Sequence, residues 1–66
     1  MNDAVRIERQ GAVATVILER PGARNAVDPA TAESLAAAFL GIERDDALRV
    51  SVLWGAGGTF CAGADL

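Results

Sequence analysis

Hydrophobic and polar residues alternate along residues 5–8 (VRIE), a period of two that predicts a β-strand with one solvent-exposed face. Residues 12–19 (AVATVILE) are rich in β-branched residues and apolar on both faces, which predicts a strand buried on both sides. Gln10 and Gly11 separate the two runs, and glycine suits a tight turn at that point. The pattern therefore predicts an antiparallel hairpin at the start of the chain.

A loop and a helix are predicted next. Residues 20–27 (RPGARNAV) contain the turn dipeptide Pro-Gly, and Asp28 followed by Pro29 is typical of a helix N-cap and first helical position. The helix is expected to extend to roughly Arg44, and Gly41 within it costs about 1 kcal/mol relative to alanine, so the helix is expected to fray or end near it. Four apolar residues fall at helical spacing and form one stripe: Leu35, Ala38, Phe39 and Ile42.

Residues 50–54 (VSVLW) predict a further strand of the buried type. A strand, a helix and a strand in this order predict a right-handed βαβ crossover with parallel pairing, so the fold class is α/β: a hairpin plus a βαβ unit. Only one helix is available to cover two strands that are apolar on both faces. One sheet face is therefore expected to be bare, which is typical of an interface or of a domain that continues. We expect the latter, with residues 1–66 forming the N-terminal part of one larger domain.

Composition narrows the classes of function. A chain of 66 residues buries only about 60% of the surface that it exposes when unfolded, yet 52% of these residues are hydrophobic. The isolated chain is therefore expected to fold with little cooperativity. The single cysteine allows no internal disulfide, and the absence of histidine removes the commonest metal ligand and the commonest general base, so no metal site is predicted.

Charge and hydropathy argue against two kinds of partner. The net charge of −3 offers no basic patch, so nucleic acid is not expected as a partner. No apolar run approaches the ~18 residues of a membrane span, and the first ten residues do not resemble a signal peptide. A cytoplasmic location is the resulting expectation.

The glycine cluster after the last predicted strand suggests nucleotide binding, but its details do not fit. Gly55, Gly57 and Gly58 begin like G-x-G-x-x-G, yet Phe60 stands where the last glycine belongs. Gly58 and Gly63 have the spacing of a P-loop, but no lysine follows. A nucleotide-binding βαβ unit is therefore kept only as a minor alternative.

Several single residues have a structural interpretation that outweighs a chemical one. Cys61 is expected to pack as a small residue, because no histidine is present to activate its thiol. Asp65 is interpreted as the N-cap of a following helix rather than as an acid, a base or a metal ligand. Trp54 is expected to pack in the core. For Arg24 and Asn25, a solvated loop with an Asx-type turn at Asn25 and a functional role both stay open.

Residues 60–66 (FCAGADL) give the strongest local signal, since they follow a strand and precede a predicted helix start. Residues this small let a backbone approach a ligand closely. The N–H groups at a helix start lack partners within the helix and lie at its positive end. The backbone N–H of Ala64 could therefore donate a hydrogen bond to a developing oxyanion.

These features together resemble the N-terminal part of the crotonase (enoyl-CoA hydratase/isomerase) superfamily across essentially all 66 residues. The resemblance lies in the order of the hairpin, the capped helix and the second strand, and in these residues: Arg20-Pro21, Arg24-Asn25-Ala26, Asp45 or Asp46, Gly55-x-Gly57 and residues 60–66.

The resemblance implies a crotonase-like fold that binds an acyl-CoA thioester and stabilises an enolate on the thioester oxygen with two backbone N–H groups. It assigns the first of these donors to Ala64, and places Arg24 near the CoA phosphates. Coenzyme A is part of the substrate, so no separate cofactor is implied. The residues that the resemblance assigns to substrate or CoA binding are Arg24, Ala26, Ala62, Gly63, Ala64, Asp65 and Leu66.

The resemblance also places the second oxyanion donor and the catalytic carboxylates beyond Leu66. The 66 residues alone are therefore expected to be inactive, and hydratase is preferred only as the namesake activity of the family. The parent enzyme is expected to be a homotrimer or a hexamer. A non-catalytic interaction module, or a pseudogene remnant with the same fold, is the alternative.

Overall fold

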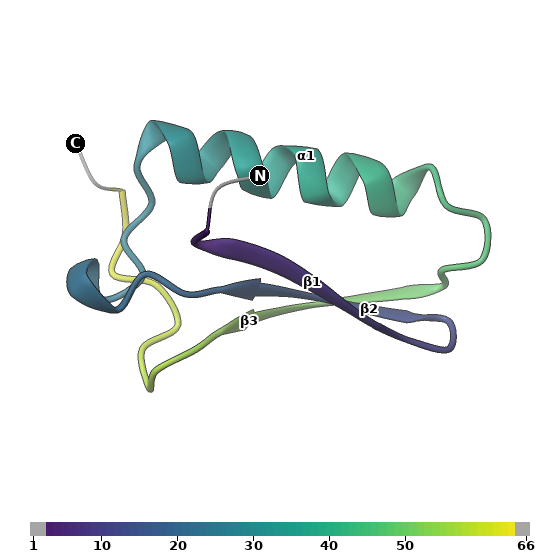
Figure 1. Ribbon diagram of the computed structural model, residues 1–66, viewed down its shortest axis with the longest axis horizontal. Helices are drawn as coiled ribbons and strands as arrows, with labels where there is room; N and C mark the ends of the chain where they lie inside the picture. Colours follow the sequence, from purple (N-terminus) through teal and green to yellow (C-terminus); the bar gives the residue numbers. More distant parts are fainter. Residues whose placement is uncertain (1–2, 65–66) are drawn as a thin grey trace.

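Val5–Gln10 (β1) and Val13–Leu18 (β2) form an antiparallel hairpin in the computed structural model, which describes residues 3–64 (Figure 1). Val5 pairs with Leu18 at one end of the hairpin and Gln10 pairs with Val13 at the other. Gly11 occupies the turn with φ of +58°, a left-handed conformation that glycine adopts without steric cost. The predicted hairpin and its glycine turn are confirmed.

The loop after β2 contains a 3-10 turn over Pro21–Ala23 (η1), and the helix α1 spans Pro29–Glu43. Asp28 caps the helix as predicted. The helix continues through Gly41, so the expected fraying or early end at that glycine is wrong. No atom lies within 4 Å of a Cβ built on Gly41, and the unbroken helix therefore carries the glycine on an open surface.

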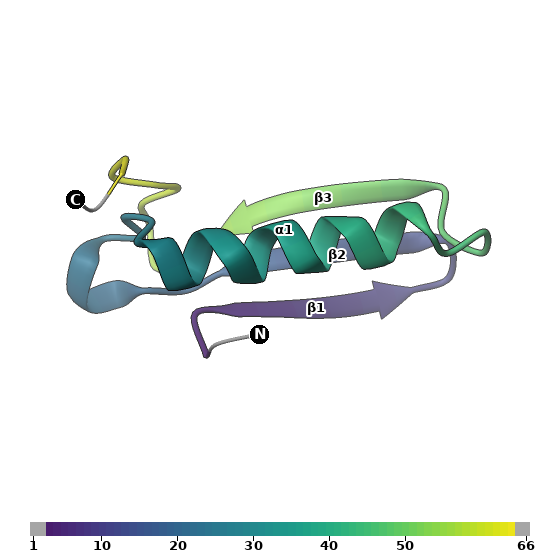
Figure 2. The same ribbon diagram turned by 90° about the horizontal axis from the view of Figure 1, so that it is seen from above.

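Val50–Gly55 (β3) pairs parallel to β2, from Val13 beside Val50 to Leu18 beside Gly55. The strand order is β1-β2-β3, so β2 is the central strand (Figure 2). The predicted mixed α/β architecture of a hairpin and a parallel βαβ unit is confirmed.

The core lies between α1 and the hairpin. Val5, Val16 and Leu18 of the sheet are buried together with Ala38 of the helix. Three further helix residues of the predicted stripe pack against this cluster while remaining partly exposed: Leu35, Phe39 and Ile42. Figures 1 and 2 show α1 extended along one face of the sheet. The apolar stripe read from the sequence is therefore the face that α1 buries.

The other sheet face is bare along β3 within the described residues, although Ile17 of β2 on the same face is 2% exposed. Side chains alternate across a strand, so Val50, Val52 and Trp54 share the face opposite to the one that Val16 turns toward the helix. Their exposed fractions are 54%, 44% and 52%. The expected bare face is confirmed. The expected burial of β3 and of Trp54 is wrong, because no described segment covers this side of β3 and Leu53 on the other side is also 41% exposed.

Candidate functional site

The start of α1 is fixed by the Asp28 side chain. One carboxylate oxygen accepts a hydrogen bond from the Thr31 backbone N–H at 2.8 Å, and the other lies 3.3 Å from the Arg20 guanidinium. The hydrogen bonds from Thr31, and to a smaller extent the charge of Arg20, hold the pKa of Asp28 below its ordinary value of 3.8. Asp28 is therefore ionised at neutral pH and acts as a structural cap.

The segment that approaches this helix start is the small-residue stretch after β3. The Val27 backbone N–H donates to the Gly63 carbonyl oxygen at 2.8 Å, and Val27 forms a parallel bridge with Ala64. Gly63 has φ of +104°, a conformation that side chains rarely allow. The Cys61 sulfur accepts a hydrogen bond from the Gly63 N–H at 3.4 Å. The segment after β3 and the segment that leads into α1 are therefore joined side by side.

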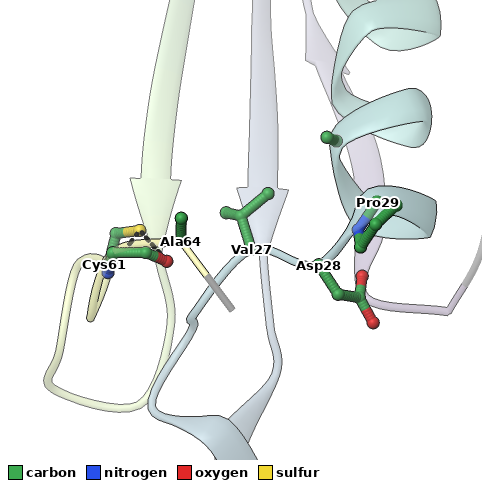
Figure 3. A pocket seen from close by; sticks show the side chains of 7 residues that line it. Val27, Asp28, Pro29, Cys61 and Ala64 are labelled. Atoms are coloured by element: carbon green, nitrogen blue, oxygen red, sulfur yellow. Dashed lines mark hydrogen bonds between the residues drawn. The ribbon is translucent and has the colours of Figure 1, made fainter. Parts of the chain in front are cut away.

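A cleft of about 530 Å³ opens where these segments meet α1 (Figure 3). Its walls are mainly apolar. Ala64 is among the residues that line it, and no hydrogen bond within the described residues takes up the Ala64 backbone N–H. The lining residues are Val27, Asp28, Pro29, Ala32, Cys61, Gly63 and Ala64. Such a cleft can hold an uncharged group beside a backbone donor.

Two residues of the loop after β2 hold that loop in place. The Arg20 guanidinium donates to the Ala26 carbonyl oxygen at 2.5 Å and pairs with Asp28. Asn25 is 1% exposed and has φ of +62°. Its side-chain oxygen accepts from the Arg20 backbone N–H at 2.7 Å, and its amide nitrogen donates to Ala56 and Thr59 carbonyl oxygens at 2.8 and 2.6 Å.

The expected solvated loop is therefore wrong for Asn25, which is buried between two loops. A weak signal was available, because asparagine tolerates the left-handed conformation better than most residues do. Its carbonyl partners lie 31 and 34 residues away in sequence, and no local pattern reveals them. Arg20 entered the prediction only as part of an Arg-Pro pair, and its role in bracing the loop was missed.

The structure brings some of the predicted site residues together and leaves others apart. Gly63 and Ala64 line the cleft, and Ala62 is exposed beside them. Ala26 precedes a cleft residue and contributes its carbonyl group to the Arg20 contact. Arg24 is exposed, with φ of +49°, and is not among the residues that line this cleft. The predictions for Asp65 and Leu66 lie outside the described residues.

Three further expectations from the sequence concern the cysteine, metal binding and membrane spans. Cys61 is partly buried and packs against the core cluster, which confirms its predicted packing role. No group of three or more potential metal ligands occurs within residues 3–64. Across the same range, no helix has both the length and the apolar character needed to cross a membrane.

Comparison with known proteins gives a consistent result. The family model described as enoyl-CoA hydratase/isomerase matches residues 8–66. The enoyl-CoA hydratase EchA19 of Mycobacterium tuberculosis is 40% identical, with 91% of this chain and 23% of that protein covered. The carnitinyl-CoA dehydratase of Proteus mirabilis is 39% identical, with 100% and 25% covered.

Solved structures agree with the sequence relatives. The enoyl-CoA hydratase of Mycobacterium tuberculosis H37Rv superimposes with a TM-score of 0.92 at 40% identity, over 96% of this chain and 28% of that one. An enoyl-CoA hydratase/isomerase from Mycobacterium paratuberculosis superimposes with a TM-score of 0.91 at 41% identity, over 96% of this chain and 25% of that one. The chain thus spans about a quarter of the length of the relatives that it matches.

Proposed function

This chain belongs to the enoyl-CoA hydratase/isomerase family, and on that basis we propose that it supplies part of the active site of an acyl-CoA enzyme. The proposed substrate is an acyl-CoA thioester, with hydratase as the preferred reaction. The proposed parent enzyme is a homotrimer or hexamer that uses no cofactor beyond the CoA of its substrate.

The observation that carries the proposal is the Ala64 backbone N–H, which belongs to a residue that lines an apolar cleft and has no hydrogen-bond partner among the described residues. A thioester carbonyl placed there would accept this hydrogen bond. Negative charge accumulates on that oxygen as the enolate forms, so a fixed donor stabilises the transition state more than the ground state.

The other parts of the proposed site follow from the family resemblance. CoA is proposed to contact residues 62–66 through its adenine, with Ala26 nearby and Arg24 close to the phosphates. The second donor and the catalytic carboxylates are proposed to come from chain outside these 66 residues. We therefore expect the 66-residue chain alone to turn over no substrate.

The test is hydration of crotonyl-CoA by the complete product of the gene that encodes this chain. The reaction is monitored through the loss of absorbance of the enoyl group. Gly63→Val is expected to lower kcat by about 10²–10³-fold, the usual effect of losing one oxyanion donor. A Cβ on Gly63 meets no atom within 4 Å, so the substitution acts through its backbone angle of +104°. Gly41→Ala on the open helix surface is the matched control and should leave kcat unchanged.

Failure of the unsubstituted gene product to bind any acyl-CoA would refute the proposal. Binding without turnover of enoyl-CoA would refute only the preference for hydratase. Other thioesters of the kinds that this family processes would then be assayed.

One observation favours a second candidate, a non-catalytic interaction module. Val50, Val52 and Trp54 form an exposed apolar face of the kind that marks protein interfaces. This candidate expects the 66-residue chain to form a defined oligomer, measured by multi-angle light scattering. A monomeric or polydisperse aggregated chain would refute it.

A further inference from the structure

The buried amide of Asn25 joins the two loops that meet at the candidate site. One loop contains residues 20–28 and leads from β2 into α1, and the other contains residues 56–64 and follows β3. All three hydrogen-bonding positions that the side chain uses are satisfied at short distances: 2.7 Å for the oxygen, and 2.8 and 2.6 Å for the nitrogen. A side chain with 1% exposure and this geometry has one defined orientation.

The two carbonyl groups that Asn25 holds lie on either side of a tight reversal of the chain. Ala56 and Thr59 flank Gly57 and Gly58, whose φ angles are +85° and +86°. Those glycines have no Cβ to restrict their rotation, so the reversal is intrinsically loose. Tying both of its ends to one amide fixes the direction in which the chain leaves β3.

The same loop holds the other end of the segment. Two residues after Asn25, the Val27 backbone N–H donates to the Gly63 carbonyl oxygen, one residue before Ala64. Residues 59–63 are therefore attached at both ends to the loop that contains Asn25. A shift of Asn25 would move both attachments together.

We infer that Asn25 is a positioning residue: by clamping residues 56 and 59 to the loop of residues 20–28, it fixes the location of the Ala64 N–H. The part of this inference that concerns catalysis rests on the proposed function. The clamp itself does not, so the two can fail separately.

Asparagine suits this position for two separate reasons. Its φ of +62° is tolerated by glycine and asparagine, and is costly for β-branched or bulky residues. Its amide offers donors and an acceptor on one planar group, whereas a carboxylate would face two carbonyl oxygens with negative charge. Asn25→Gly therefore keeps the backbone conformation and removes the clamp. Asn25→Asp replaces the amide N–H donor with a carboxylate oxygen, which is an acceptor.

The first test is hydrogen–deuterium exchange of the ligand-free complete gene product, followed by mass spectrometry of peptides. Asn25→Gly removes three hydrogen bonds to a buried group, and exchange in residues 26–28 and 57–64 is expected to accelerate by about tenfold or more. Hairpin residues 5–18 should be unaffected. The exposed helix substitution Glu33→Gln is the control and should change neither region.

Asn25→Asp adds a pH signature that a general loss of stability would not give. Burial and the facing carbonyl oxygens raise the pKa of an introduced carboxyl group, because both disfavour its charge. At neutral pH this variant should exchange as fast as Asn25→Gly. Below the raised pKa the neutral carboxyl regains one O–H donor, so protection of residues 57–64 should partly return, relative to wild type at each pH.

The inference is overturned if residues 57–64 keep their protection in Asn25→Gly, or if hairpin protection falls equally in an Asn25→Gly protein that remains folded. If Asn25→Gly unfolds, Asn25→Asp decides, since absence of local recovery at low pH also overturns the clamp. In the crotonyl-CoA assay, the variants that lose more protection of residues 57–64 against exchange should also lose more of the wild-type kcat. Unchanged kcat with lost protection would overturn the positioning role, while a wild-type protein that binds no acyl-CoA but shows the expected exchange pattern would refute only the proposed function.

Discussion

Gly55, the last residue of β3, is the glycine whose side-chain space is occupied by backbone. A Cβ built on Gly55 would lie 2.6 Å from the Phe60 Cα and 2.8 Å from the Phe60 carbonyl carbon. The contacted atoms belong to the main chain, so rotation of a flexible side chain cannot relieve the clash. Gly55→Ala must therefore displace the loop that leads from β3 to Ala64.

The size of the effect follows from these distances. Ordinary contacts of a Cβ begin near 3.4 Å, so the Phe60 Cα must move by about 0.8 Å, and the Phe60 carbonyl oxygen, which lies closer still, must move by more. Overpacking of this kind costs about 1–3 kcal/mol of unfolding free energy. A misplacement of about 1 Å can also cost about 10²-fold in rate where catalysis depends on position. We expect Gly55→Ala to lower both stability and turnover.

The assay is urea denaturation of the complete gene product, with crotonyl-CoA turnover measured in parallel. Gly41→Ala adds the same methyl group at a helical position with no atom within 4 Å, and should stabilise by about 0.5–1 kcal/mol. The two substitutions are thus expected to have opposite signs. Equal midpoints for Gly55→Ala and wild type, with unchanged turnover, would refute the close approach of Gly55 and Phe60.

Three further predictions concern the core, the pH dependence and the bare face. Leu18→Ala removes a side chain that is 2% exposed in the core and should cost about 2–5 kcal/mol by urea denaturation, with an unchanged slope. Hydrogen bonds from Thr31 lower the pKa of Asp28, and a hydrogen bond from Arg9 lowers that of Asp45. Both carboxylates therefore stabilise the folded state fully at pH values above their ordinary pKa of 3.8, and this stabilisation is lost as the pH falls below 3.8. The melting temperature of a D28N/D45N variant should therefore depend less on pH in that range than the melting temperature of the wild type. The isolated 66-residue chain should bind the dye ANS through its bare face, and V52T/W54T should reduce that fluorescence, whereas unchanged fluorescence would show that the dye binds elsewhere.

Local patterns were sufficient where local chemistry determines the structure. The hairpin follows from alternation on either side of Gly11, and the helix start follows from Asp28-Pro29, whose cap uses a backbone N–H three residues away. Parallel pairing of β3 with β2 follows from the connecting helix. In each case the interacting residues are close in sequence or joined by one regular element.

Patterns were insufficient where burial depends on distant chain. Trp54 is a large apolar residue at the end of an apolar strand, yet it is half exposed. Its burial depends on what packs over the strand and not on the strand itself. Asn25 is a residue type typical of exposed loops, yet it is buried. Asn25 follows β2, whereas the carbonyl groups that its amide nitrogen contacts follow β3. A polar residue in a loop says little about whether a second loop covers it.

The position of the site follows from the direction of β2 and β3. Both strands run the same way, so the loops after Leu18 and Gly55 leave the same edge of the sheet. The loop after β2 must reach α1, and its geometry is fixed by the helix cap at Asp28. The loop after β3 has no such anchor among the described residues, and it contains three glycines with positive φ. Besides the bond from the Ala56 N–H to the Leu18 carbonyl oxygen and the packing of Cys61 on the core, the contacts that shape it come from the first loop, through the Asn25 amide and the Val27 N–H. A donor on the second loop therefore depends on those contacts for its position.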